Sequence, residues 1–484
     1  PNGVVLIVAS ESAGFITAFH PVTYPGSNPG YITSGTVPTN PVASVSTPLC
    51  FATMSWGVGV VNINSPGAGY AAAPTVTFSS GAATATSALG PASSGNPLVP
   101  GFFQQRLVLA GQTQAPQSFN MSQPISIYNF NTSSPIQEDD AISGQLISGE
   151  LNKIVSLVPM QAGLIVLSDK ISWLINGGSA GSGVSPVNIV ANPQSYIGAN
   201  DVPPIIANYD ILYVQAKGSV VRDNAFNFYT NVFTGTDISV LSSHLFYGYT
   251  IAEWAWAEEP FKLVWAVRSD GTALTLTFLK EQELAGWAHS TTHGQFKSVA
   301  TVSEENNGEI TDAVYFVVAR TVNGIPVKYI ERLAERKFTR GKTDAWCVDA
   351  GLRCDGVPAT AFSGGEHLGG LPVTGVADGN PIPAFVMPVN GTFTLGSPAS
   401  VVIVGLPYTA TFTTLPLDMS EPTVQGKRKQ ITGVDIRVQD TLGLTIGRTL
   451  ATQVQMKDLV EGNVGTQSNA VVSGLFTGDA RTII

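Results

Sequence analysis

The fold is decided by residues 263–278, LVWAVRSDGTALTLTF, and by residues 314–330, VYFVVARTVNGIPVKYI, which repeat one layout. Each stretch joins two runs of β-branched and aromatic residues through a glycine turn. Asp270-Gly271 and Asn323-Gly324 are typical of type I′ hairpin turns, because both residues of each pair tolerate the positive φ that such a turn requires. The two stretches therefore predict two successive β-hairpins.

The same hairpin recurs along the chain at nearly constant spacing. Gly271 lies 53 residues before Gly324, and Gly218, in an earlier turn, lies 53 residues before Gly271. Asp169 marks a further turn 49 residues before Gly218, and Gly111 ends a candidate fifth copy another 58 residues back. A period of about 50 residues is typical of propeller blades, which hold four strands each. We therefore predict an all-β fold with a β-propeller core. The alternative is a β-sandwich with evenly spaced hairpins.

Shifts in composition divide the chain into four predicted parts. Residues 1–100 contain short strands and a glycine-rich β insertion, and residues 101–338 contain the propeller blades. Residues 339–425 form a second, small β domain, and residues 426–484 form a hairpin region that is expected to return to the propeller. The chain begins at Pro1, and we expect it to be part of a longer product. Five tryptophans are expected to fill the space between blades, namely Trp173, Trp254, Trp256, Trp265 and Trp287.

The composition points to a protein that covers much of its surface with partners. Charged residues make up 12% of the chain, about half the usual share, whereas hydrophobic residues make up 44%. No run of 18 apolar residues occurs, so no stable membrane span is expected. The centres of protein interfaces are depleted in charge, which fits this balance. The formal net charge of −10 argues against a surface that grips phosphate. It is compatible with a wall along which DNA slides.

The cysteines are few and widely spaced. Cys50, Cys347 and Cys354 form no C-x-x-C pair. We expect buried free thiols, with a Cys347–Cys354 bridge across a turn as the alternative. An oxidising compartment is not indicated.

Two short motifs suggest catalysis or metal binding, but their contexts favour ordinary loops. Residues 177–181 match the G-x-S-x-G expression, yet the nucleophile elbow requires a following helix, which residues 182–186 do not favour. His289 and His293 are four residues apart, but they lie in a strand-to-loop context, where zinc ligation on one helix face is not expected. We expect no metal site and no cofactor.

Adjacent carboxylates are the residues that a glycosidase would use. Such an enzyme needs two of them about 5–9.5 Å apart across a sugar-binding cleft. The candidates are Glu258-Glu259, Glu304-Glu305 and Glu138-Asp139-Asp140. Solvated loops are the favoured interpretation, with Asp139-Asp140 as a pair that ties down a turn.

Two basic clusters hold the concentrated positive charge. They are candidates for contact with DNA or with a neighbouring ring of subunits, and the alternative is a solvated face that offsets nearby acids such as Glu331 and Glu335. The clusters consist of Arg332, Arg336, Lys337, Arg340 and Lys342, and of Lys427, Arg428 and Lys429.

An ordered set of short stretches resembles the tail nozzle (tail tube B) proteins of short-tailed bacteriophages. The stretches span about residues 101–447, whereas residues 1–100 match poorly. They are 103–111 (FQQRLVLAG), 139–142 (DDAI), 268–272 (RSDGT), 281–283 (EQE) with 286–287 (GW), 329–333 (YIERL), 377–379 (ADG), 404–408 (VGLPY) and 425–429 (QGKRK).

The resemblance implies a virion structural protein with no catalytic role. It implies six copies of the chain in a ring below the head-to-tail adaptor, with tail fibres or spikes docked outside and double-stranded DNA passing through the lumen. It places the protein in the virion tail, assembled in the host cytoplasm. The alternatives are a propeller-type glycosidase or depolymerase and a glycan-binding adhesin. A glycosidase would be active as a monomer and would lose activity on replacement of one Glu or Asp.

Overall fold

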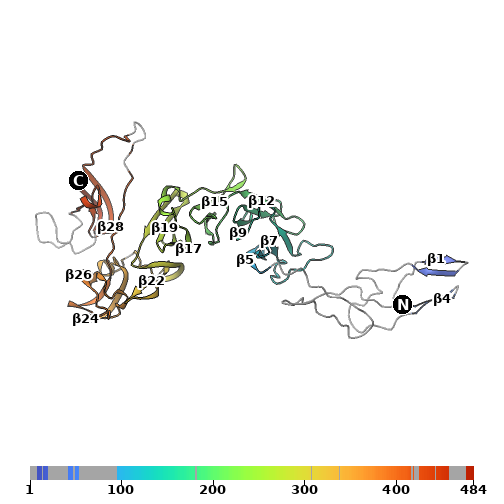
Figure 1. Cartoon of the computed structure of the whole chain (residues 1–484), viewed down its shortest axis with the longest axis horizontal. Coiled ribbons are helices and arrows are strands. Elements are labelled where there is room, and N and C mark those ends of the chain that lie inside the picture. The colour runs from blue at the N-terminus through green and yellow to red at the C-terminus, as the bar shows by residue number, and fades with distance from the viewer. Residues whose placement is uncertain are drawn as a thin grey trace. The chain divides into compact units, whose positions relative to one another are not determined.

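The chain forms two compact units, residues 1–96 and residues 97–484, in the computed structural model (Figure 1). The structure describes residues 8–12, 15–19, 42–46, 49–53, 95–179, 182–306, 308–336, 338–415, 418, 424–441, 443–456 and 476–483. In the first unit, two antiparallel pairs are described: β1 (Val8–Ser12) with β2 (Phe15–Phe19), and β3 (Val42–Ser46) with β4 (Leu49–Thr53). The predicted glycine-rich insertion lies outside the described residues.

The second unit is built from antiparallel sheets whose strands follow one another in chain order. Four sheets have four strands and a fifth has three (Figure 1). The first two sheets are β5 (Pro97–Phe103), β6 (Arg106–Gln112), β7 (Ala115–Met121) and β8 (Ile142–Gln145), then β9 (Ile154–Met160), β10 (Gly163–Ser168), β11 (Ser172–Asn176) and β12 (Val190–Ser195). The third and fourth are β13 (Ile205–Ala207), β14 (Asp210–Val214), β15 (Val221–Asn227) and β16 (Val232–Thr234), then β17 (Ile251–Ala257), β18 (Leu263–Arg268), β19 (Ala273–Leu279) and β20 (Leu284–Ser290). The fifth is β21 (Gln295–Asn306), β22 (Glu309–Val322) and β23 (Ile325–Arg332).

The predicted hairpins are confirmed, and each copy supplies the second and third strands of one sheet. The candidate fifth copy is also confirmed, because β6 occupies the same place as β10, β14, β18 and β22. Asn323 and Gly324 both have positive φ, at 51° and 80°, as a type I′ turn requires. The same prediction for Asp270-Gly271 is wrong. Only Gly271 of that pair has positive φ, because the side chain of Asp270 instead accepts a hydrogen bond from the backbone of Thr272 and closes a longer turn.

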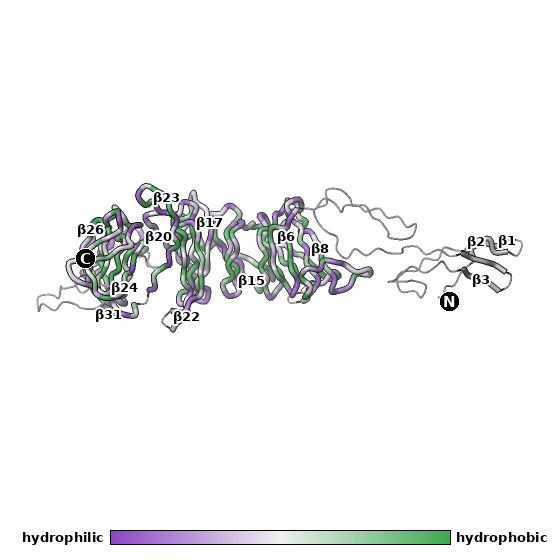
Figure 2. Tube along the Cα trace, turned by 90° about the horizontal axis from the view of Figure 1, so that it is seen from below, coloured by the Kyte–Doolittle hydropathy of each residue, from purple (hydrophilic) through white to green (hydrophobic). Residues whose placement is uncertain are grey.

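In the second, third and fourth sheets, the second strand is buried on both faces, so consecutive sheets pack face to face. On β10, Leu164 and Val166 pack toward the first sheet, whereas Ile165 and Leu167 pack toward the third. The same alternation on β14 and β18 joins the third sheet to the fourth and the fourth to the fifth. Because successive strand residues point to opposite faces, these uninterrupted apolar runs are what a stack of sheets requires. The fold is all-β and propeller-like, and Figure 2 shows the apolar residues concentrated along these strands.

Tryptophans fill the space between the sheets, as predicted. Trp173 packs between the first two sheets, Trp254 between the third and fourth, and Trp265 between the fourth and fifth. Trp256 and Trp287 pack against the edge of the third and fourth sheets' core. The Trp287 ring meets Phe246 edge-to-face at 4.9 Å.

The first sheet begins at Pro97, before the predicted boundary at residue 101. Residues 97–100 contain two prolines, yet they pair with β6 from Pro97 opposite Gln112. Proline is tolerated there because β5 is an edge strand. On the outer side of such a strand, no neighbouring strand needs the N–H group that proline lacks.

A separate sheet follows the repeats, in the region of the predicted second β domain. Its order is β24 (Asp349–Phe362), β27 (Phe393–Leu406), β25 (Pro372–Ala377) and β26 (Asn380–Val386), so β24 and β26 are the edge strands. Val402 and Val404 of β27 pack into its core with Val373 and Leu368. Gly379, in the β25–β26 turn, has a φ of 77°, and a Cβ there would lie 2.7 Å from Cγ of Lys342. Only glycine fits this turn.

The C-terminal strands pair differently from the prediction. β28 (Gly433–Thr441) pairs with β31 (Phe476–Ile483), and the short β29 (Thr445–Ile446) pairs with β30 (Val454–Gln455). Within the predicted hairpin region of residues 426–484, β28 therefore forms no hairpin with the next strand β29, and none of these described strands pairs with the five repeat sheets. Complementary charges fit the observed register, in which Arg437 lies opposite Asp479 and Asp435 opposite Arg481.

Candidate functional site

The long loop between β7 and β8 is held in place by hydrogen bonds of Arg106 and Asp140. These two residues belong to two of the stretches that carry the resemblance. The Arg106 side chain is buried and donates hydrogen bonds to three backbone carbonyls, those of Ser122 at 2.7 Å, Asp140 at 2.7 Å and Glu138 at 3.2 Å. The Asp140 carboxylate accepts from the backbone N–H groups of Gln137 and Ser133, each at 2.8 Å. These bonds, led by that of Gln137, hold the pKa of Asp140 below its ordinary value. The prediction that this acid ties down a turn is confirmed.

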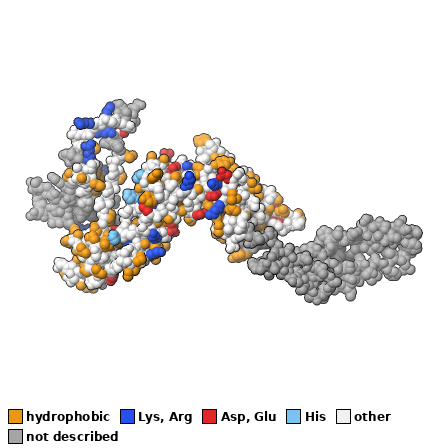
Figure 3. All heavy atoms as spheres, in the orientation of Figure 1, with side chains coloured by type: hydrophobic (Ala, Val, Ile, Leu, Met, Phe, Trp, Pro, Cys, Tyr) orange, Lys and Arg blue, Asp and Glu red, His pale blue; other side chains and the backbone are white. Residues whose placement is uncertain are grey.

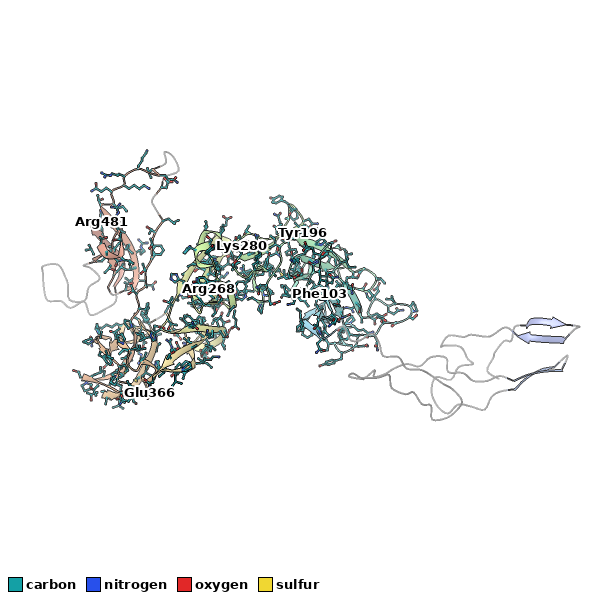
Figure 4. The ribbon with its side chains drawn as sticks, in the orientation of Figure 1. Phe103, Tyr196, Arg268, Lys280, Glu366 and Arg481 are labelled. Carbon is teal, nitrogen blue, oxygen red and sulfur yellow. The ribbon has the colours of Figure 1, made fainter. Side chains whose placement is uncertain are left out.

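Both ends of β19 are fixed by ion pairs, one of Arg268 and one of Lys280. Figure 4 labels these two residues. At one end, the Arg268 guanidinium donates to both carboxylate oxygens of Asp270, at 2.8 and 2.6 Å, and lies 4.0 Å from the centre of the Tyr249 ring. The Arg268 contact lowers the pKa of Asp270. At the other end, Lys280 Nζ lies 2.6 Å from Asp223 and 3.3 Å from Asp210, both on the preceding sheet. Residues 268–272, one of the stretches that carry the resemblance, therefore stabilise the turn between β18 and β19.

Two arginines of the first basic cluster form ion pairs with acids both near and distant in sequence. Arg332 pairs with Glu304 and Glu335, each at 3.1 Å. Arg340 pairs with Asp344 at 2.9 Å and Asp355 at 2.8 Å, and Arg353 joins the same two carboxylates. This group links the connection after β23 to the edge strand β24. Arg332 and Arg340 are thus paired with carboxylates of their own chain.

The other members of this cluster are placed as follows. The Arg336 guanidinium lies 5.0 Å from the centre of the Phe261 ring, a cation–π distance. The stem of Lys342 packs beside Gly379, and Lys337 lies outside the described residues.

The second basic cluster lies on an exposed segment between two sheets. Residues 407–432 connect β27 to β28, and Lys427, Arg428 and Lys429 are all exposed there. In Figure 3, Lys and Arg side chains gather along the segment that leads to β28. The same segment exposes large apolar side chains, with Phe412 at 89% and Leu415 at 87% exposed. We call residues 407–415 the arm.

An open groove lies at one end of the second β domain. It has a volume of about 750 Å³ and is lined by uncharged residues from the ends of β24, β26 and β27. Phe393 forms its aromatic wall, with its ring stacked on Phe362 at 5.4 Å and near Phe385 at 5.6 Å. Sequence reasoning missed this groove, because its walls come from β27 and from the two opposite edge strands β24 and β26, which no local pattern links.

The motifs considered for catalysis and metal binding lie in turns and at strand ends. Ser179 is exposed and its backbone carbonyl accepts from the Ser182 hydroxyl at 2.7 Å, and residues 182–189 form a turn rather than a helix. His289 and His293 are exposed. No group of three metal-ligating side chains occurs within the described residues.

Of the carboxylate pairs at residues 258–259 and 304–305, the first takes part in hydrogen bonds through its backbone and the second through the Glu304 side chain. Glu258 and Glu259 line a small cavity of about 200 Å³ together with Asp312, but Asp312 Oδ2 accepts from the backbone N–H groups of both glutamates. Glu304 accepts from the Tyr315 hydroxyl at 2.5 Å as well as pairing with Arg332.

The thiols are free but not buried. Cys347 is exposed and Cys354 is half-buried, and they are not bonded to each other. The expectation of burial is wrong for Cys347 because the neighbouring Ala345 and Val348 occupy the buried positions of that segment. The side chain of Cys50 lies outside the described residues.

The fold defines an all-β protein of stacked four-stranded sheets, and comparisons with known proteins add the following. No protein-family model and no curated protein matches the chain. The chain is similar to the crystal structure of human WBSCR16, with 11% identity, a TM-score of 0.27, and coverage of 48% of this chain and 67% of that one. It is also similar to Raptor of Chaetomium thermophilum, with 13% identity, a TM-score of 0.29 and coverage of 66% of this chain. The chain spans 28% of the Raptor chain, and neither likeness carries an argument about function. No helix of the described residues is long and apolar enough to cross a membrane.

Proposed function

We propose that this chain is a structural subunit of a short-tailed bacteriophage tail, a nozzle protein that forms a ring of six copies. Double-stranded DNA would pass through its lumen, the head-to-tail adaptor ring would lie above it, and fibres or spikes would dock outside. The protein would act in the virion tail after assembly in the host cytoplasm. It has no catalytic role in this proposal, because a closed channel works by shape alone.

The observation that carries the proposal is the exposure of large apolar side chains on a charge-poor chain. Phe228, Tyr229, Leu241, Phe412 and Leu415 are each more than 80% exposed in the single chain. Scattered apolar residues are normal on a protein surface. Many large apolar side chains that are almost fully exposed, on a chain with only 12% charged residues, are typical of a surface that partner proteins cover. A ring subunit is covered in this way by its neighbours.

The charge distribution supports a channel that does not hold DNA tightly. The net charge is −10, and Arg332 and Arg340 of the first basic cluster are already paired with carboxylates. Binding to DNA is dominated by unpaired basic groups that displace counterions from phosphates. A weakly repulsive wall lets the genome slide.

Particle mass and negative-stain class averages test the proposal. We expect the purified protein, alone or with its adaptor, to form sixfold rings with an open lumen. A strictly monomeric particle in the presence of the adaptor would contradict the nozzle assignment, and a screen for polysaccharide cleavage would then examine the glycosidase alternative.

The second basic cluster is expected to make a small, salt-dependent contribution to DNA affinity. Replacing Lys427 and Arg428 with glutamine should reduce retention on a DNA column at low salt and lower the salt slope by about two, one unit for each lost phosphate contact. The matched control is Arg340→Gln, which removes a paired arginine and should leave the slope unchanged. An unchanged slope in the double variant would assign residues 427 and 428 to a protein contact instead.

A further inference from the structure

The five repeat sheets pack on one another through the same two kinds of face. On β18, Val264 packs toward the preceding sheet, whereas Trp265 packs toward the following one, where its ring meets Phe316 edge-to-face at 5.7 Å. The cores between the first and second sheets and between the second and third repeat this arrangement. The chain therefore shows four times that the following face of one sheet fits the preceding face of the next.

The first sheet has no sheet before it, and the face that it leaves open is apolar. The alternate residues of β6 lie in the core with the second sheet, so Leu107 and Leu109 point to the other side. Phe102 of β5 lies opposite Leu107 and is 62% exposed. The four strands contain one charged residue, Arg106, which is buried. We call this the front face, and it consists of Leu98, Pro100, Phe102, Leu107 and Leu109.

The fifth sheet leaves its following face open in the same way. The alternate residues of β22 lie in the core with the fourth sheet, and cross-strand pairing joins the remaining ones into a second apolar face. Ile330 on this face is 78% exposed. Its charged neighbours are Lys328, which is exposed, and Arg332, which is paired with Glu304. We call this the back face, and it consists of Ala300, Val302, Tyr315, Val317 and Ile330.

The stack of sheets leaves both faces open within one chain. Among the described residues, no hydrophobic core contains side chains of both the first and the fifth sheet, and three sheets lie between them. Proteins built from stacked repeats need a polar outer face on their terminal repeats to stay soluble, and the front face carries no charge. A second copy of the chain presents the kind of face on which each of the two packs elsewhere in the stack.

We propose that the back face of one copy packs on the front face of the next copy, as a fifth contact of the kind that the chain makes four times internally. The two faces differ, so the contact is head-to-tail and repeats from copy to copy. Such contacts generate a ring when the rotation closes. The inference rests on the proposed function, because it specifies the contact that joins the copies of that ring.

Charge substitutions in the full chain test the two faces. Phe102→Asp and Ile330→Asp are each expected to raise the concentration for half-maximal assembly at least about tenfold, because each places a charge between two apolar faces. Both side chains are exposed in the single chain, so thermal unfolding of the monomer should change little. Sedimentation velocity measures assembly. An unchanged concentration in either variant would overturn the inference.

Ile325→Asp is the matched control for Ile330→Asp. Ile325 begins the same strand, is 63% exposed and points to the other side of the sheet. Its replacement is expected to change the concentration for half-maximal assembly less than about twofold, and equal losses in the two isoleucine variants would overturn the inference. Phe412→Asp, in the arm, is expected to weaken assembly less than Phe102→Asp. An equal loss there would assign the contact to the arm and overturn the inference too.

Mixing the two damaged chains gives the sharpest result. Phe102→Asp retains a sound back face and Ile330→Asp retains a sound front face, so a mixture of the two can form one contact. At a concentration that assembles the wild type, we expect each variant alone to be monomeric and the mixture to form dimers without rings. Rings that persist in both variants would overturn the inference and leave the nozzle proposal standing.

Two other occupants of the front face give different results. Unchanged rings of Phe102→Asp with faster proteolytic release of residues 1–96 would assign the face to that unit of the same chain. Unchanged rings with loss of adaptor binding would assign it to the adaptor. Either result would overturn the inference, whereas a wild-type chain that never assembles would contradict the nozzle proposal as well.

Discussion

Replacing Arg106 with methionine is expected to lower the free energy of unfolding by about 3–5 kcal/mol. The guanidinium is buried and donates to the carbonyls of Ser122, Glu138 and Asp140, and a methionine of similar length leaves all three acceptors without this donor. Denaturant unfolding measures the loss, and hydrogen exchange should show faster exchange within residues 122–141. Arg106→Lys should recover part of the loss, because one ammonium can serve only some of the carbonyls.

The control for this arginine is Arg437→Met. Arg437 is exposed and pairs with Asp479 across β28 and β31, so its loss should cost no more than about 0.5 kcal/mol. A loss below about 1 kcal/mol for Arg106→Met would show that the β7–β8 loop is held by its other contacts.

Replacing Asp223 with alanine is expected to cost about 3 kcal/mol. This carboxylate is buried and accepts from Lys280 Nζ at 2.6 Å, from the Thr236 hydroxyl at 2.6 Å and from the Thr236 backbone N–H at 2.7 Å. It joins β15 to the residue that follows β19, so its loss should loosen the third sheet from the fourth. Asp201→Asn is the matched control, because Asp201 also faces one lysine but is exposed.

The same carboxylate predicts how stability depends on pH. Burial raises the pKa of Asp223, but the hydrogen bonds from Lys280 and Thr236 outweigh burial, and the net pKa lies below its ordinary value. A lowered folded-state pKa stabilises the protein above the unfolded value of about 4, and that stabilisation is lost as the pH falls below it. The stability difference between wild type and Asp223→Ala should therefore be constant from pH 7 to 5 and shrink below about pH 4. A difference that grows on acidification would contradict this assignment.

The repeat sheets were predictable because their signals are local. Residues 263–278 contain both strands and the turn of one hairpin. A continuous apolar run indicates a strand that is buried on both faces, whereas alternating apolar and polar residues indicate a half-exposed strand. The 53-residue spacing then extends the prediction to the neighbouring sheets. The turn at Asp270 was misassigned because a side-chain bond to Thr272 overrides the preference of the dipeptide.

The candidate site was not predictable in the same way, because its partners are far apart in sequence. Arg332 looks like a free cation until the fold brings Glu304 to it across β21 and β23. β28 pairs with β31, which begins 35 residues after β28 ends, and no turn signal links the two. The groove joins residues of β26 to the ends of β24 and β27, although β24 and β26 are opposite edges of the sheet, and the rings of Phe362, Phe385 and Phe393 meet there.

The chain-order sheets also affect how the protein is made. Each of the four-stranded repeat sheets is completed by a continuous segment, such as residues 154–195 for the second sheet. A sheet of this kind can therefore form on the ribosome soon after its last strand emerges, and each new sheet finds the apolar face of the preceding one ready to cover it. Local pairing of this type shortens the time during which strand edges are exposed. Sequential closure therefore protects the growing chain from pairing with other chains before its own sheets are complete.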